Sequence, residues 1–191
     1  MIEFGRHQMQ NSMRITTDFL RQTRGVAAVE FALILPILLV LFLGSVELTN
    51  ALTANRKVSQ VASTVGDLVA QYRTLECATM TDIFKASSAI MTPYDDDGLV
   101  ISVAGVEIDK DGDAKVKWSR TNSGGSAAGL VSEIPDSLKI ANTYLVVAKT
   151  EYVYQAMFNA FSNDQFGRTS FPLDDVFFLR PRAGDEVKFT C

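Results

Sequence analysis

The chain has 191 residues, about the length of one domain, and its 18 basic and 22 acidic side chains give a net charge of −4. An acidic chain has little electrostatic attraction for a phosphate backbone, so nucleic-acid binding is not expected. The only histidine is His7, so the rest of the chain has no imidazole for acid-base catalysis, a Ser-His relay or a histidine-containing zinc site. We therefore expect no enzyme activity, no catalytic residues, no metal and no cofactor.

A short basic head precedes a long apolar segment. Residues 26–45 are apolar apart from Glu30, and a helix of twenty such residues, rising about 1.5 Å per residue, matches the hydrocarbon thickness of a bilayer. A buried core helix is the alternative, but such helices keep a polar stripe, whereas residues 33–43 are apolar on every side. The sequence therefore predicts a transmembrane helix over residues 26–46.

The charges on the two flanks predict the orientation of this helix. Arg14, Arg21 and Arg24 precede it, while the other flank begins with Glu47. The positive-inside rule places the N-terminus in the cytoplasm, so the residues after about 46 would be exported. Pro36 removes one hydrogen bond within the helix and favours a modest kink, or it is a neutral passenger.

The residues before the apolar segment carry a processing motif. Arg24-Gly25 followed by Val26-Ala27-Ala28-Val29-Glu30-Phe31 resembles the type IV prepilin signal. In that signal a dedicated peptidase cuts after Gly, and the mature chain has Glu at its fifth position and an aromatic residue at its sixth. A secretory signal peptide is instead cut after its apolar stretch, where Thr49-Asn50-Ala51 is a weak candidate.

The pattern R-G-x-A-A-V-E-F-A-L-x-x-P, from Arg24 to Pro36, resembles the opening of the TadE-like family. That family comprises minor pilins or pseudopilins of the tight-adherence (Tad, or Flp) pilus. The resemblance covers roughly residues 24–72, with looser similarity at Pro93-Tyr94, residues 149–154, residues 179–182 and the terminal Cys191. It implies a pilin-like fold, cleavage between Gly25 and Val26 by a prepilin peptidase, and partners among other pilins, pseudopilins and the assembly platform.

Glu30 is the anomalous residue of the apolar segment. The resemblance implies that it pairs with the N-terminal ammonium of Val26 on a neighbouring subunit, since opposite charges at short range favour each other's ionised form. The alternative is that Glu30 reaches the lipid interface or becomes protonated.

After the membrane the helix is predicted to continue as an amphipathic helix. Apolar residues recur at spacings of three and four: Ala51, Ala54, Val58, Val61, Val65, Leu68 and Tyr72. This stripe is expected to pack on the sheet of its own domain, with packing between subunits as the alternative. A second helix is predicted over residues 82–91, with Thr81 as its N-cap and Pro93 after its end.

The remainder is predicted to form strands. These are residues 99–109, 114–119, 143–154, 176–179 and 187–190, with a hairpin turn at 110–113 and a Gly/Ser loop at 121–129. Leu99, Ile101, Val103 and Gly105 would share one face. The fold class is therefore α+β, with the long N-terminal helix on a small antiparallel sheet.

Two groups of aspartates are best interpreted as turns. Asp109, Asp111 and Asp113 are spaced as in a calcium loop, but the EF-hand position that needs Glu holds Arg120. The segment from Asp95 to Gly98 is likewise predicted to be a turn.

Cys77 and Cys191 are the only cysteines. An even pair in an exported domain indicates a disulfide, with two free thiols or intermolecular pairing as alternatives.

These interpretations divide the chain into a basic leader (1–25), a transmembrane helix (26–46) and an extracytoplasmic pilin-like domain (47–191). The expected function is that of a minor pilin or pseudopilin in the assembly of a Tad pilus, located in the bacterial inner membrane by a single span. The alternatives are an uncleaved, membrane-anchored binding module and an exported hydrolase that uses Asp or Glu, for which the sequence singles out no carboxylate pair.

Overall fold

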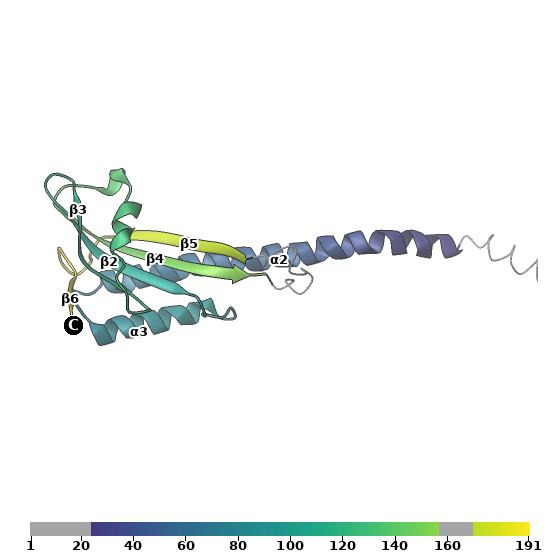
Figure 1. Cartoon of the computed structure of the whole chain (residues 1–191), viewed down its shortest axis with the longest axis horizontal. Coiled ribbons are helices and arrows are strands. Elements are labelled where there is room, and N and C mark those ends of the chain that lie inside the picture. Colours follow the sequence, from purple (N-terminus) through teal and green to yellow (C-terminus); the bar gives the residue numbers. More distant parts are fainter. Residues whose placement is uncertain (1–23, 157–169) are drawn as a thin grey trace, which may run out of the picture. The chain divides into compact units, whose positions relative to one another are not determined.

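The structure is a computed structural model, and it describes residues 24–156 and 170–191 (Figure 1). The chain divides into two compact units between Val46 and Glu47. Most of the expected leader, residues 1–23, lies outside the described residues. The assignment of the segments to a leader, a span and an exported domain stays a prediction.

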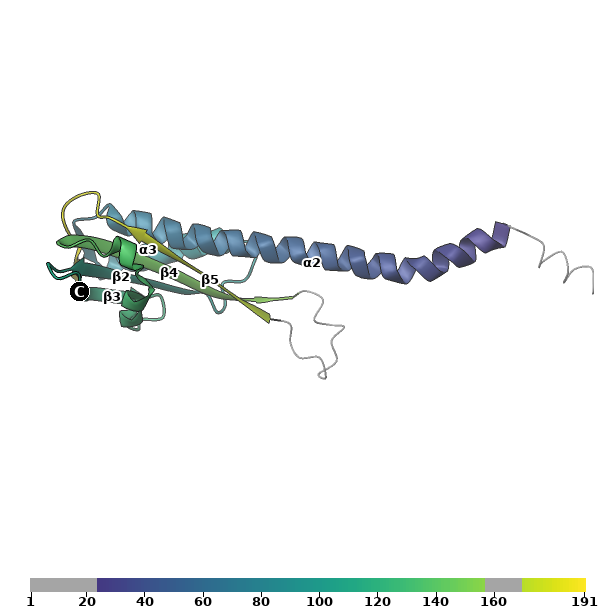
Figure 2. The same ribbon diagram turned by 90° about the horizontal axis from the view of Figure 1, so that it is seen from above.

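The helix α2 (Arg24–Ala70) runs for 47 residues and contains Pro36. Within the described part of the chain, it is the one helix long and apolar enough to cross a membrane. The large apolar side chains of its first half are exposed to solvent rather than packed in a core. Figure 2 shows a bend in the purple N-terminal part of this helix, as expected where a proline interrupts the backbone hydrogen bonds.

The second half of α2 belongs to the second unit and has the predicted buried stripe. Ala54, Val58, Val61 and Val65 are fully buried in its core. Tyr72 was expected in this stripe, but its side chain is 41% exposed because the helix ends at Ala70. The stripe packs on the unit's own sheet, as predicted.

The second helix begins earlier than expected. The helix α3 (Cys77–Ser88) continues into the short helix η1 (Ala89–Met91), so the predicted start at residue 82 is wrong. Thr81 is not an N-cap: it lies inside the helix, where its Oγ1 donates a hydrogen bond of 2.9 Å to the carbonyl of Cys77. The earlier start allows Met80, together with Ile83 and Phe84, to enter the core.

Four strands form an antiparallel sheet in the order β3-β2-β4-β5. Their bounds are β2 (Val100–Ile108), β3 (Ala114–Thr121), β4 (Thr143–Gln155) and β5 (Ser170–Leu179). The strand expected at residues 176–179 is thus only the end of the longer β5. The α+β class with a helix on a small antiparallel sheet is confirmed.

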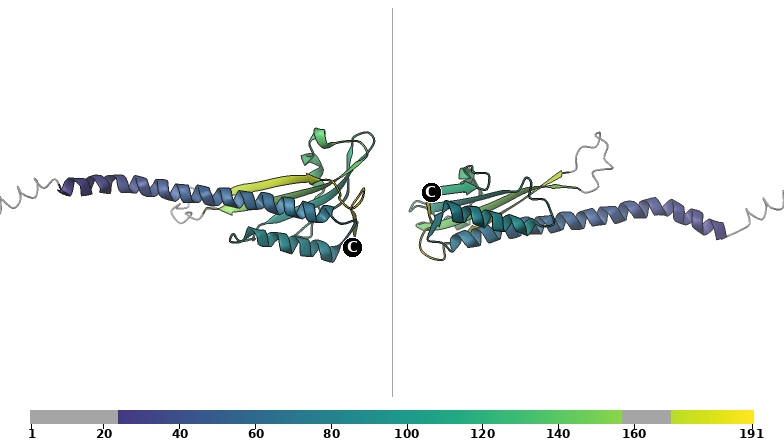
Figure 3. Two further views of the ribbon diagram at one scale, coloured as in Figure 1. Left: turned by 180° about the vertical axis from the view of Figure 1, so that it is seen from behind. Right: turned by 90° about the horizontal axis from the view of Figure 1, so that it is seen from below.

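The two faces of this sheet are covered differently. Figure 3 shows α3 beside the C-terminal part of α2, and both helices pack on the face that carries Ile101, Val103 and Val146. The opposite face packs against Leu130 and Ile134, around the short helix η2 (Ala128–Glu133), which is followed by η3 (Asp136–Leu138). Both faces are therefore buried over part of their area.

The structure contains a second sheet, which the sequence does not predict and which brings the two cysteines close together. It pairs β1 (Thr74–Glu76) in parallel with β6 (Lys188–Thr190), and Glu76 stands opposite Thr190. The residue that follows each strand is a cysteine, so this register brings the Cα atoms of Cys77 and Cys191 to 5.3 Å. The two residues form a disulfide, as one of the three alternatives predicted.

Candidate functional site

The prepilin-like motif occupies the first two turns of α2. Gly25 has open space around it, since a Cβ at this position would meet no atom within 4 Å. Val26 and Phe31 are exposed. The first turn of a helix also lacks part of its hydrogen bonds, so it unwinds at little cost. Among the described residues, the Gly25–Val26 bond therefore has open space beside it at a helix end that unwinds easily.

Glu30 follows Val26 by four residues, so the two share one face of the helix, one turn apart. The exposed side chains around it are apolar, among them Val29 and Leu33. A carboxylate in such a setting costs about 2–4 kcal/mol in a membrane unless a partner offsets it. The helix thus presents one acid on an otherwise apolar surface, close to the end that cleavage would create.

Residues 25–67 match the profile of a family described as TadE-like protein. This TadE-like segment begins at Gly25, the residue before the expected cleavage site, and ends near the C-terminus of α2. It contains the motif, the exposed apolar half of the helix and most of the stripe that packs on the sheet. No curated protein and no solved structure gave a significant match to the chain.

The later residues that resembled the family, such as Pro93-Tyr94 and the terminal Cys191, lie outside the TadE-like segment. The sheet and α3 are therefore described by the structure alone.

Two tyrosines form hydrogen bonds with residues at the start of the second unit. The hydroxyl of Tyr154, near the end of β4, donates a hydrogen bond of 2.8 Å to Oε1 of Glu47. The hydroxyl of Tyr94 donates to the carbonyl of Asn50 at 2.9 Å, and the two rings meet edge to face at 6.1 Å. Burial, and then the carboxylate of Glu47, raise the pKa of Tyr154, so the phenol stays protonated and remains a donor at neutral pH.

The sequence did not single out these contacts. Tyr154 and Glu47 are separated by 107 residues. Pro93-Tyr94 resembles the family, but no local pattern indicates the partner of Tyr94. Only the strand register identifies the residues that meet here.

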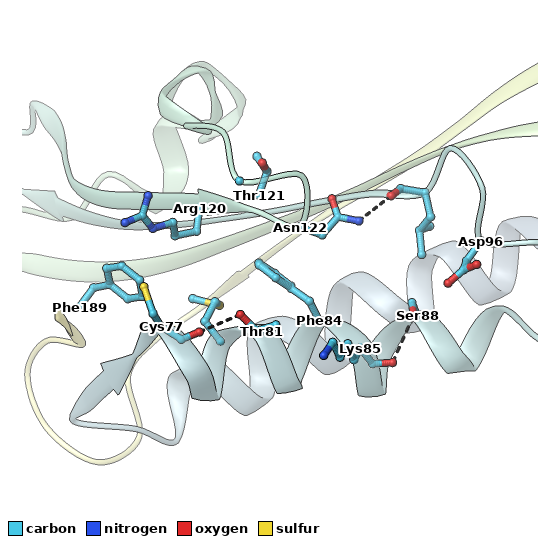
Figure 4. A pocket seen from close by; sticks show the side chains of 13 residues that line it. Cys77, Thr81, Phe84, Lys85, Ser88, Asp96, Arg120, Thr121, Asn122 and Phe189 are labelled. Carbon is cyan, nitrogen blue, oxygen red and sulfur yellow. Dashed lines mark hydrogen bonds between the residues drawn. The ribbon is translucent and has the colours of Figure 1, made fainter. Parts of the chain in front are cut away.

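A cavity of about 490 Å³ lies between α3 and the end of β3 (Figure 4). Phe84, Leu99 and Phe189 supply apolar surface, while Lys85, Arg120 and Asp96 supply charge. The guanidinium of Arg120 lies 5.0 Å from the centre of the Phe189 ring, which orients it by a cation–π contact. The volume suits a small organic molecule or one or two side chains of a peptide.

The two aspartate groups behave as turns. The carboxylate of Asp109 accepts hydrogen bonds from the backbone N–H groups of Asp111 and Asp113 and pairs with Lys115, which lowers its pKa. Its oxygens are thus engaged within the hairpin turn. The carboxylates of Asp95, Asp96 and Asp97 come within 4.8 Å of one another, but all three are exposed.

The predicted site residues therefore fall into two groups. Gly25, Val26, Glu30 and Phe31 lie together at the start of α2, in the first unit. Cys77 and Cys191 are joined in the second unit.

Proposed function

We propose that the chain is a minor pilin or pseudopilin that takes part in the assembly of a Tad (Flp-type) pilus after a prepilin peptidase has cut between Gly25 and Val26. The observation that carries this proposal is the TadE-like segment, which starts at Gly25 and coincides with a helix that has an exposed apolar first half. A helix with this surface needs lipid or other apolar helices around it.

The first half of α2 serves both stages of this role. Before assembly it spans the inner membrane, with the basic leader in the cytoplasm and the domain from Glu47 onward in the periplasm. During assembly the same apolar surface packs against the helices of other pilins or of the assembly platform. The function requires binding and no catalysis.

Cleavage gives Glu30 a partner. The new terminus at Val26 carries an ammonium group, and the carboxylate of Glu30 on an adjacent subunit can pair with it. Such a pair sets the axial position of one helix against the next, because both groups lie at a defined height on an otherwise apolar surface.

The N-terminal sequence of the protein in its native membrane tests this proposal. We expect the mature chain to begin at Val26. In a Gly25→Leu variant the leader should be retained, because the side chain blocks the position before the cut. Gly44→Leu is the matched control, since a Cβ at Gly44 also meets no atom within 4 Å and lies in the same helix.

An uncleaved chain in the native membrane would contradict the proposal and favour the alternative, an anchored periplasmic or surface binding module. The cavity between α3 and β3 is the feature that supports this alternative. The two functions differ in the mature N-terminus, which is Val26 in one and lies within the leader in the other.

A further inference from the structure

A group of exposed apolar side chains lies near the hydrogen bond between Tyr154 and Glu47. The group comprises Leu48 and Leu52 on α2 and Phe171 on β5, and is called the juxtamembrane patch below. Phe171 stands directly opposite Tyr154 in the pairing of β4 with β5, so the two side chains share one face of the sheet. Leu48 follows Glu47, and Leu52 lies one helical turn further on the same face.

Covalent connection places this patch near the end of the apolar segment. Glu47 is the first residue after the expected span of residues 26–46. At about 1.5 Å per residue, Leu48 lies about 3 Å and Leu52 about 9 Å along the helix from Val46. The polar layer of a bilayer is about 5–7 Å deep on each side, so Leu48 falls within this layer and Leu52 just beyond it.

The strands β4 and β5 are held at the same level. Tyr154 binds Glu47 directly, and Tyr94 binds the carbonyl of Asn50 in the same turn of α2. Phe171 therefore lies one strand spacing, about 5 Å, from a residue that contacts the first residue after the span. The patch thus comes from two elements, α2 and β5, close in the chain or in the sheet to the residue that follows the expected span.

We propose that the juxtamembrane patch contacts the interface of a neutral phospholipid membrane, with Phe171 as its main anchor. This inference rests on the membrane insertion proposed above. Aromatic side chains favour the boundary between headgroups and acyl chains, and tyrosines beside them present an apolar ring and a polar hydroxyl to that layer. The exported domain is then held at the membrane by a second contact besides its helix.

The charges near the patch favour neutral over anionic lipid. Arg56 and Lys57 follow it on α2, but Glu47 directly precedes Leu48. Burial, and then the nearby carboxylate of Asp95, raise the pKa of Tyr152. With both signs present, attraction to anionic headgroups contributes little, and apolar contact carries the interaction.

Tryptophan fluorescence of the full chain in phosphatidylcholine vesicles tests the proposal. Phe171→Trp places a probe in the patch, and Ile140→Trp is the matched control, because the two native side chains are 47% and 48% exposed. Ile140 precedes β4, whose length puts it about 35 Å from Tyr154. The one native tryptophan, Trp118, is common to both variants.

In vesicles with brominated acyl chains, we expect the added tryptophan of Phe171→Trp to be quenched about twofold or more relative to that of Ile140→Trp. Leu48→Trp, a second probe at an exposed position of the patch, should follow Phe171→Trp. Adding phosphatidylglycerol should change the quenching little. Equal quenching at residues 171 and 140 would overturn the proposal. A blue shift of the fluorescence at residue 171 that disappears when the protein is diluted would also overturn it, because such a shift reflects contact with a second copy of the chain.

Leu39→Trp separates this inference from the proposed function. Leu39 lies in the middle of the apolar segment and should be quenched strongly if that segment is in the bilayer. Quenching at residue 39 but not at residue 171 would overturn the juxtamembrane contact alone. No quenching at residue 39 would overturn the membrane insertion together with it.

Discussion

Glu30 is the only charged residue between Gly25 and Ser45, and it lies one turn after Val26. Its position in an apolar stretch is costly in lipid and useful only if a partner of opposite charge is present. The proposed cleavage after Gly25 would produce such a partner. One processing event would then create both the free helix end and the cation that its fifth residue can meet.

A Glu30→Gln variant tests this pairing while keeping the size of the side chain. We expect correct cleavage at Gly25 but about tenfold less incorporation into the pilus or its base, because a hydrogen bond to a charged group contributes about 1.5–3 kcal/mol. The fraction of protein that copurifies with assembled pili measures the effect. Glu47→Gln is the control, since its amide oxygen still accepts the hydrogen bond of Tyr154. Wild-type incorporation of cleaved Glu30→Gln would exclude the pairing.

At the level of the elements, side chains from two strands bind the C-terminal segment at a single carbonyl group. Nε1 of Trp118 on β3 and the hydroxyl of Tyr144 on β4 donate to the carbonyl of Val187 at 2.7 and 2.9 Å. Burial raises the pKa of Tyr144 to about 12, so its hydroxyl remains a donor at neutral pH. Gly105 on β2, between them, makes room, because a Cβ there would overlap both side chains.

Gly105→Ala should therefore destabilise the second unit. Overpacking of a filled core position costs about 1–3 kcal/mol, and the added methyl group would also disturb the two hydrogen bonds to Val187. The fluorescence of Trp118 during thermal unfolding of the full chain in detergent measures the change. Gly129→Ala, where a Cβ meets no atom within 4 Å, should remain near wild type. Equal stability of the two variants would contradict the assigned packing.

At the scale of the whole molecule, the disulfide between Cys77 and Cys191 closes a loop of 114 residues. It links Cys191 to the start of α3. It thereby also holds in place the segment that supplies the carbonyl of Val187. Cross-links of long loops stabilise mainly by restricting the unfolded chain. The disulfide therefore acts on nearly the whole second unit.

Replacing both cysteines by serine should lower the free energy of unfolding of this unit by about 2–5 kcal/mol. A chemical denaturation curve of the full chain in detergent measures the loss. A reducing agent should lower the stability of the wild type by a similar amount and leave the double variant unchanged. Two titratable thiols in the protein isolated from its native membrane would show that the bond does not form there.

The sequence alone determined the features that depend on local pattern and on chemistry in adjacent residues. The long helix, its apolar first half and its buried stripe follow from the order of apolar and polar residues, because helical periodicity is a local property. The shared face of Leu99, Ile101 and Val103 follows from strand alternation in the same way. The motif from Gly25 to Phe31 is contiguous, so this part of the candidate site needs no knowledge of the fold.

Only the tertiary structure decided which distant segments meet. The pairing of β1 with β6 rests on two strands of three residues, too short for any periodic pattern to predict. The predicted helix start at residue 82 is too late, because burial of Met80 outweighs the capping preference of Thr81. The juxtamembrane patch likewise depends on the bond between Glu47 and Tyr154, 107 residues apart. Contacts over such separations are selected by the packing of the whole unit, which no short stretch of the sequence encodes.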